Sequence, residues 1–187
     1  HYQASFRHPD RDKTHGRIWR ITAKDRPLAK APDLSKMTAA ELCEQLKSDW
    51  RYVRYQVKRR LADLPKDEII PAITKWVDAL DQSDPNFEHH LYEAIGVFES
   101  HEVVNRSLLE RLLKAKDYRA RAYATRVAGR WHDRLEAPLE LLDRSVTDGS
   151  ARVRLEAVVA CSDIHTANSM VVAAKAASHP MDRFINF

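Results

Sequence analysis

The residues best suited to chemistry in this chain of 187 amino acids are its nine histidines. His89 and His90 are adjacent, and neighbouring side chains on a helix point about 100° apart, so these two cannot share one metal ion. His101 falls beyond the end of the same expected helix. We therefore interpret the histidines as surface residues or as core residues whose ring nitrogens are hydrogen-bonded, and we predict no metal site.

Motifs of known catalytic sites do not occur in the sequence. It contains no G-x-S-x-G, no glycine-rich phosphate loop and no cysteine–histidine pairing pattern. Cys43 and Cys161 are flanked by apolar positions and are predicted to be buried thiols. Because C-x-x-C and C-x-x-C-H are both missing, thiolate metal sites and covalent haem are excluded within this chain. The sequence thus predicts neither an active site nor a cofactor here.

The composition limits the classes of protein to which this chain can belong. Thirty-one basic residues are balanced by 27 acidic ones, mostly interspersed as on solvated helix faces. No apolar run approaches the ~18 residues of a membrane helix, so we expect no membrane-spanning segment and no membrane partner. The first ten residues carry no apolar signal core and no initial methionine, so the chain is expected to be a fragment.

An internal repeat organises the elements that must position any site. Three stretches share an aspartate, an apolar residue, an arginine and a further apolar residue: residues 49–57, 117–124 and 148–157. Their arginines lie at positions 54, 121 and 154, spaced by 67 and 33 residues. A fourth copy fits residues 84–94 and aligns Leu91 with the arginine position. That copy is therefore predicted to lack the charge.

Each copy follows a segment with apolar residues at i, i+3 and i+4, which predicts an amphipathic helix. These segments are residues 41–48, 68–80, 106–115 and 135–146. Pro71 and Pro138 occupy equivalent positions near two of the helix starts, where proline is tolerated. Thr38 and Glu41 have the spacing of a capping box. A helix pair this short cannot bury its apolar stripe alone, so neighbouring pairs must stack.

The repeating unit resembles the HEAT repeat: a first helix with a proline, an aspartate turn, and a second helix with a V-R-x-x-A pattern. We predict an all-α, HEAT-repeat α-solenoid of about four and a half helix pairs over residues 38–187, truncated in the fifth repeat. A short non-helical segment precedes it, and residues 25–37, with two prolines, are predicted to be a linker.

The turn aspartates and the helix arginines are predicted to form a structural ladder between stacked repeats. Each aspartate can accept backbone N–H bonds at the following helix start. Each arginine can reach the aspartate of an adjacent unit. The predicted ladder comprises Asp49, Arg54, Asp117, Arg121, Asp148 and Arg154.

Nucleic-acid binding is the alternative function. Residues 51–60 interleave basic residues with Tyr52 and Tyr55, and a second basic run ends beside Trp131 and Asp133. HEAT-like DNA alkyl-base glycosylases use aromatic residues and an aspartate. The competing interpretation assigns Arg54 and Arg121 to the ladder and places both tyrosines and Trp131, like Trp50 and Trp76, at core spacing. On that interpretation nucleic acid is not the expected partner.

The segment GRIWRIT, residues 16–22, is strand-like and has no partner strand in the sequence. Together, residues 8–22, 49–63, 90–131, 151–162 and 179–187 resemble the bacterial putative membrane-bound dehydrogenase, or haem-binding-domain, family. Its members join a sorbosone-dehydrogenase-like β-propeller, HEAT repeats and a cytochrome c domain. The resemblance implies that residues 1–24 are the remnant of an upstream propeller, with Trp19 and Ile21 on one face of its last strand. Within this chain those residues are expected to be irregular or to pair with another chain.

The resemblance also implies a function for the chain. The propeller would hold the oxidising site, and the cytochrome domain would hold haem c. This chain would be a non-catalytic scaffold or spacer whose partners are those adjacent domains and other proteins. Members of the family are expected to be exported, which implies a periplasmic location.

Overall fold

A computed structural model of the protein describes residues 9, 14–16, 21–22, 24–28, 30–180 and 183. The chain divides into two compact units, residues 1–31 and 32–187. The described residues of the first unit form neither helix nor strand, and Ile21 is 96% exposed. Most of the predicted propeller strand, including Trp19, lies outside the described residues. The unit boundary falls inside the predicted linker, residues 25–37.

The second unit contains nine α-helices and two short 3-10 helices, and no strand occurs among its described residues. In chain order they are η1 (Leu34–Lys36), α2 (Ala39–Gln45), α3 (Arg51–Ala62), α4 (Lys66–Asp78), α5 (Phe87–Ser100), α6 (Arg106–Leu112), α7 (Tyr118–Arg130), α8 (Pro138–Ser145), α9 (Ala151–Asp163), α10 (Ala167–Ala174) and η2 (Lys175–Ser178).

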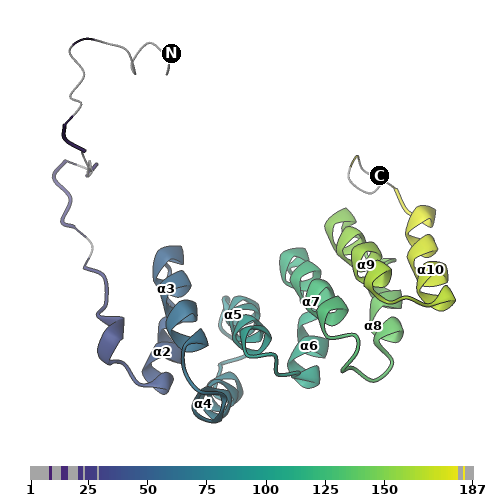
Figure 1. Ribbon diagram of the computed structural model, residues 1–187, viewed down its shortest axis with the longest axis horizontal. Helices are drawn as coiled ribbons and strands as arrows, with labels where there is room; N and C mark the ends of the chain where they lie inside the picture. Colours follow the sequence, from purple (N-terminus) through teal and green to yellow (C-terminus); the bar gives the residue numbers. More distant parts are fainter. Residues whose placement is uncertain are drawn as a thin grey trace. The chain divides into compact units, whose positions relative to one another are not determined.

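These helices are arranged as stacked antiparallel pairs: α2 with α3, α4 with α5, α6 with α7, and α8 with α9. The second helices of the pairs, α3, α5, α7 and α9, lie side by side as one layer, and the first helices form the other (Figure 1). Helix α10 packs on both α8 and α9, as the first helix of a fifth pair would. The predicted all-α solenoid of about four and a half helix pairs is confirmed.

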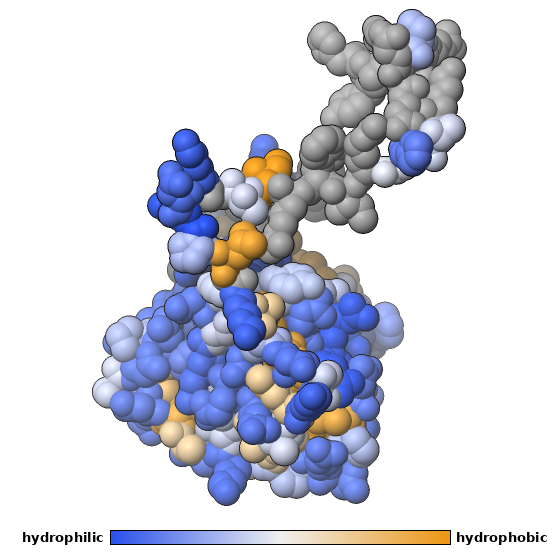
Figure 2. Space-filling model, turned by 90° about the vertical axis from the view of Figure 1, so that its left-hand side faces the viewer, coloured by the Kyte–Doolittle hydropathy of each residue, from blue (hydrophilic) through white to orange (hydrophobic). Residues whose placement is uncertain are grey.

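One continuous apolar core runs between the two layers. Its largest fully buried side chains come from several repeats and include Leu42, Leu61, Phe98 and Trp131. On the side where α2 and α3 lie, the surface is largely hydrophilic with only small apolar patches (Figure 2). Among the described residues of the second unit, no further repeat covers this side, which suits its polar surface.

Both cysteines belong to this core, as the sequence predicts. Cys43 and Cys161 are buried and unbonded. Burial raises the pKa of the Cys43 thiol to about 12, because the apolar surroundings disfavour the thiolate. The thiols therefore act as small hydrophobic groups.

Pro138 is the first residue of α8, as expected, whereas Pro71 lies inside α4. The two helices differ because α4 already begins at Lys66, directly after Pro65, while the left-handed backbone of Ala137 delays the start of α8. The repeat positions agree, but α4 extends further at its N-terminal end.

The predicted capping box at the start of α2 is present. The hydroxyl of Thr38 accepts the backbone N–H of Glu41 at 3.3 Å, and the Glu41 carboxylate accepts the backbone N–H of Thr38 at 2.8 Å. We expect Thr38→Ala to lower the free energy of unfolding by about 1 kcal/mol, because it removes the hydroxyl that accepts the N–H of Glu41 and donates to the Glu41 carboxylate. Urea titration followed by circular dichroism measures the change.

Thr74→Ala is the matched control, because the hydroxyl of Thr74 only donates to the carbonyl of Ile70 within α4. Its expected effect is below about 0.5 kcal/mol. Equal losses in the two variants would mean that the capping box contributes nothing.

Candidate functional site

The three arginines of the predicted ladder occupy one position in the repeat. Each is the fourth residue of its helix, in α3, α7 and α9. In each, Nη1 donates at 2.7 Å to the carbonyl oxygen six residues earlier: Ser48 for Arg54, Ala115 for Arg121 and Asp148 for Arg154. The arginine thus fixes the turn within its own helix pair.

One of the three predicted links between repeats is formed by the expected residues. Arg121 donates from Nε and Nη2 to the two carboxylate oxygens of Asp148, at 2.7 and 3.0 Å, which is a bidentate pair. Arg54 instead contacts Glu93 on α5, with Nε 2.9 Å from Oε1. Arg154 donates to the carbonyl oxygen of Pro180 and contacts no carboxylate among the described residues. The Arg121–Asp148 link is therefore as predicted, whereas Arg54 and Arg154 form other links.

The other two aspartates of the ladder do not bind arginines of a neighbouring repeat. Asp117 accepts the backbone N–H of Arg119 at 2.8 Å and pairs with the guanidinium of the same residue. In place of an arginine, the preceding repeat offers Glu88, whose carboxylate accepts the backbone N–H groups of Lys116 and Asp117 at 2.8 and 3.1 Å. Asp49 is exposed and has neither a hydrogen bond nor an ion pair from its side chain within the described part of the chain.

In the second repeat, His90 takes the structural place of the arginine. It is the fourth residue of α5, and its Nε2 lies 3.3 Å from Oδ2 of Asp84, six residues earlier. Leu91, which the sequence aligned with this position, is buried in the core instead. The charge predicted to be lost is thus replaced by an imidazole one residue earlier, because α5 begins at Phe87, one residue earlier than that alignment assumes.

The pair of Arg121 and Asp148 has a definite pH dependence. Burial raises the pKa of the Asp148 carboxyl, but the hydrogen bonds from Arg121 and from the backbone of Ser150 outweigh burial and hold it below 3.8. A carboxyl with a lowered pKa in the folded state stabilises the fold above its unfolded-state pKa, and this contribution is lost as the pH falls through the folded-state pKa.

We therefore expect Asp148→Asn to be less stable than the unaltered protein by a constant margin above about pH 5. That margin should shrink below about pH 4, where the carboxyl of the unfolded state binds a proton, and it should be lost once the pH falls through the lower folded-state pKa. Thermal unfolding followed by circular dichroism between neutral and acidic pH measures it. A margin that stays constant down to about pH 2 would contradict this assignment.

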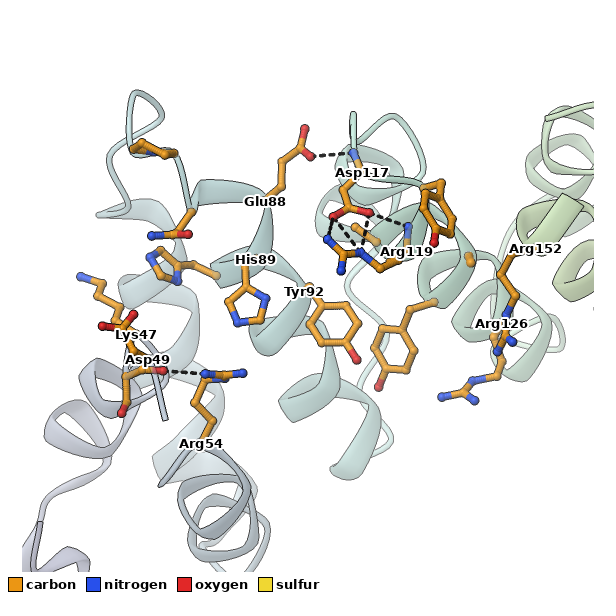
Figure 3. Close-up of a pocket in the computed structure, with 18 of the residues that line it drawn as sticks. Lys47, Asp49, Arg54, Glu88, His89, Tyr92, Asp117, Arg119, Arg126 and Arg152 are labelled. Carbon is orange, nitrogen blue, oxygen red and sulfur yellow. Dashed lines mark hydrogen bonds and ion pairs between the residues drawn. The ribbon is translucent and has the colours of Figure 1, made fainter. Parts of the chain in front are cut away.

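An open groove of about 1060 Å³ crosses the N-terminal ends of α3, α5 and α7. We call it the aromatic groove and define it by the side chains of His89, Tyr92, Tyr118, Tyr123, Arg126 and Arg152, which line it together with residues of the turns before α3, α5 and α7. Figure 3 shows Asp49 and Arg54 at one side of this groove, His89 and Tyr92 in its middle, and Arg126 and Arg152 at the other side.

Rings form a continuous row along the floor of the aromatic groove. His89 stacks on Tyr92, with ring centroids 5.9 Å apart and planes 15° apart, and Tyr92 contacts Tyr123 at 4.7 Å. The guanidinium of Arg126 lies 5.0 Å from the centroid of Tyr123, a cation–π contact. Contacts of this kind fix the rings of α5 and α7 relative to each other.

Two members of the row have shifted pKa values. Burial, followed by hydrogen bonding to Glu99, raises the pKa of Tyr123, whose hydroxyl donates to Glu99 Oε2 at 2.5 Å. Burial lowers the pKa of His89, and the nearby cations Arg54 and Lys58 lower it further against the opposing effect of Glu93. His89 is therefore biased towards its neutral form, and Tyr123 stays protonated.

Most charges that line the groove are already paired within the described residues. Arg119 binds Asp117, Arg152 binds Glu156 at 2.8 Å, and Arg54 binds Glu93. Two are not: Arg126 has only its contact with Tyr123, and Asp49 has no partner among the described residues. The groove thus presents an unpaired anion at one side and an unpaired cation at the other (Figure 3).

Sequence reasoning missed the aromatic groove, although a signal was present. Tyr92 and Tyr123 each lie two residues after the fourth residue of their helix, so they occupy the same position in successive repeats. Two rings at one repeat position on adjacent stacked helices are neighbours in space.

The burial of the aromatic side chains agrees only in part with the prediction that they belong to the core. Trp76 and Trp131 are buried, as expected. Tyr52 and Tyr55, however, are 68% and 54% exposed, and Trp50 is 47% exposed. These three lie in or beside α3, and no repeat of the described residues packs on its outer side. Their burial was predicted wrongly.

No protein-family model, curated protein or solved structure matches this chain. Among the described residues, no helix is long and apolar enough to cross a membrane. In the same part of the chain, no three histidine, cysteine, aspartate or glutamate side chains gather as the ligands of a metal ion would.

Proposed function

We propose that this chain is a non-catalytic scaffold of helical repeats that holds an extended segment of a protein partner in the aromatic groove. The observation that carries this proposal is the row of rings, from His89 to Arg126, which crosses two repeats on the floor of an open groove. Tyrosine and arginine are enriched at protein interfaces, because they supply large contact areas together with hydrogen bonds.

Three of the carboxylates that line the groove support a structural role over a catalytic one. Asp117 and Glu156 are held by arginines of their own helices, and Glu88 accepts two backbone N–H groups at a helix start. A general acid or base needs a free proton site within reach of a substrate. Carboxylates already committed to such bonds instead keep the walls of the groove rigid.

The two unpaired charges of the groove indicate in which direction the partner segment would bind. A basic side chain of the partner would meet Asp49, and an acidic one would meet Arg126, with apolar or aromatic side chains between them over Tyr92 and Tyr123. Such charge complementarity fixes the direction of binding more than it adds affinity.

The resemblance to the dehydrogenase family suggests the identity of the partner. On that proposal the segment belongs to the adjacent propeller or cytochrome domain of the same exported polypeptide, and the solenoid fixes the distance between electron donor and acceptor. The intact mass and the reduced-minus-oxidised absorption spectrum of the native polypeptide test this context. A mass near 21.6 kDa without a c-type haem signal would remove it.

The nucleic-acid alternative is not favoured by the geometry. Four of the five arginines of the second basic run are paired with carboxylates: Arg119 with Asp117, Arg121 with Asp148, and Arg130 and Arg134 with Glu102. The fifth, Arg126, lies over the ring of Tyr123. Trp131 is fully buried and offers no face on which a base could stack, and Asp133 is exposed beside Arg134. Base-excising enzymes need a ring and a carboxylate together in an accessible pocket.

Site-specific photo-crosslinking tests the groove. A benzophenone amino acid at position 118, an exposed position of the groove, should cross-link to one defined segment of the partner domain in the native polypeptide. The same group at the exposed position 75 on α4 is the control. Arg126→Ala should weaken the cross-link at position 118. Equal cross-linking at both positions would refute a specific groove.

A further inference from the structure

The outer face of α3 is not explained by the aromatic groove. It carries Arg51, Tyr52, Tyr55 and Arg59, all exposed, and we call it the basic–aromatic face. These residues are spaced at i, i+1, i+4 and i+8, which places them on one side of a helix. The opposite side, with Val53, Val57 and Leu61, is buried in the core.

The positive charge of this face is unbalanced. Helix α3 contains five basic residues and no acidic one. Two of the five, Arg54 and Lys58, bind Glu93 of α5 at 2.9 and 2.8 Å. The other three, Arg51, Arg59 and Arg60, contact no carboxylate within the described residues, and Arg59 lies over the ring of Tyr55 at 6.0 Å.

The pattern fits a protein partner better than a nucleic acid. The exposed carboxylates Asp63, Asp67 and Glu68 follow α3 directly in the chain, so the run of positive charge ends with this helix. A single-stranded nucleic acid needs a basic track that follows its backbone, and aromatic faces that are free for stacking. Here the track ends after one helix, and one face of Tyr55 is covered by Arg59.

We propose that the basic–aromatic face is a second docking surface, which binds an acidic segment of a protein independently of the aromatic groove. Arg51 and Arg59 are eight residues apart, or about 12 Å along the helix. In an extended partner this distance corresponds to about four residues. The segment therefore carries two acidic residues about four positions apart, with an apolar side chain between them over Tyr52 and Tyr55.

A designed peptide tests this surface on the whole 187-residue chain. The probe is a fluorescein-labelled peptide made of repeats of Glu-Ser-Leu-Ser, with acidic residues four positions apart. Fluorescence anisotropy should give a Kd in the micromolar range at about 0.1 M salt. Arg51→Ala combined with Arg59→Ala should raise the Kd about tenfold or more, and Tyr52→Ala combined with Tyr55→Ala about fivefold.

The control variant removes the same charge elsewhere. Lys66→Ala combined with Lys75→Ala changes two exposed lysines of α4 and should leave the Kd within about twofold. Arg126→Ala in the aromatic groove should leave it unchanged as well. Circular dichroism and Tm confirm that each variant is folded.

Three results would overturn the proposal. The first is a Kd weaker than about 1 mM for the unaltered protein. The second is an equal loss in the Lys66 and Lys75 variant, which would mean attraction by net charge alone. The third is tighter binding of single-stranded oligothymidine than of the peptide, lost on changing Arg51 and Arg59, which would make this face a nucleic-acid site.

Discussion

Arg121→Ala is expected to lower the free energy of unfolding by about 2–4 kcal/mol. The substitution removes the bidentate pair with Asp148 and leaves that carboxylate, whose side chain is only 14% exposed, without its cation. It also leaves the carbonyl oxygens of Ala115 and Lys116 without the guanidinium donor. Urea unfolding, followed by the ellipticity of the helices, measures the loss.

Arg119→Ala is the control from the same helix. Arg119 also forms an ion pair, with Asp117, but its side chain is 76% exposed, so solvent screens the interaction. Its removal should leave the free energy of unfolding nearly unchanged. Equal losses in the Arg119 and Arg121 variants would mean that burial of the pair is irrelevant.

A double-mutant cycle isolates the link between repeats. If Arg121 and Asp148 act mainly on each other, Arg121→Ala should cost far less in a protein that already carries Asp148→Ala. The cost that remains reports the two carbonyl contacts within the turn. An undiminished cost would show that Arg121 stabilises only its own turn.

The other two arginines should contribute less than Arg121. Removal of Arg54 leaves Glu93 with Lys58 at 2.8 Å, and Arg154 contacts only carbonyl oxygens. We expect losses of about 1–2 kcal/mol for each. The ranking depends on contacts that the sequence does not reveal, because all three arginines follow the same pattern in the repeat.

The helical repeat itself was predictable from the sequence, because the apolar period and the capping residues act locally. The capping box of Thr38 and the turn bonds of Asp117 and Asp148 involve residues within three positions of each other. Such contacts depend on spacing alone. The fold class therefore followed from periodicity and from the need of short helix pairs to stack.

The links between repeats could not be predicted in the same way. Which carboxylate meets Arg54 depends on how far α5 is shifted along α3, and this shift brings Glu93 to the arginine in place of a turn aspartate. The exposure of Tyr52 and Tyr55 likewise depends on the outer side of α3 having no helix packed on it among the described residues. Helical spacing predicts which residues share a face, but not whether another helix covers that face.

Gly129→Val is expected to lower the free energy of unfolding by about 3 kcal/mol. A β-carbon at position 129 would lie 2.5 Å from Cβ and 3.0 Å from Cα of Ala160, so α7 and α9 could not keep their present separation. These two helices are in the most extensive contact of any pair in the described part of the chain. Since one obstacle is backbone, a change of rotamer cannot relieve the overlap.

Gly129→Ala separates overlap from helix propensity. Alanine favours a helix interior by about 1 kcal/mol over glycine, and overpacking opposes this gain by about 1–3 kcal/mol. We expect a net loss, measured by thermal unfolding. Gly149→Ala is the control, because nothing lies within 4 Å of a β-carbon there and its backbone has no positive φ. That variant should be neutral or slightly more stable.

Ala160→Gly combined with Gly129→Ala should recover part of the loss, because it removes the nearer of the two obstructing atoms. Recovery would show that the contact between α7 and α9 sets the cost. The same contact holds Arg126 on α7 beside Arg152 on α9 at one side of the aromatic groove. A variant that forces the helices apart should therefore also weaken cross-linking at position 118, whereas Gly149→Ala should not. Stability unchanged by Gly129→Val would contradict this account of how the groove keeps its width.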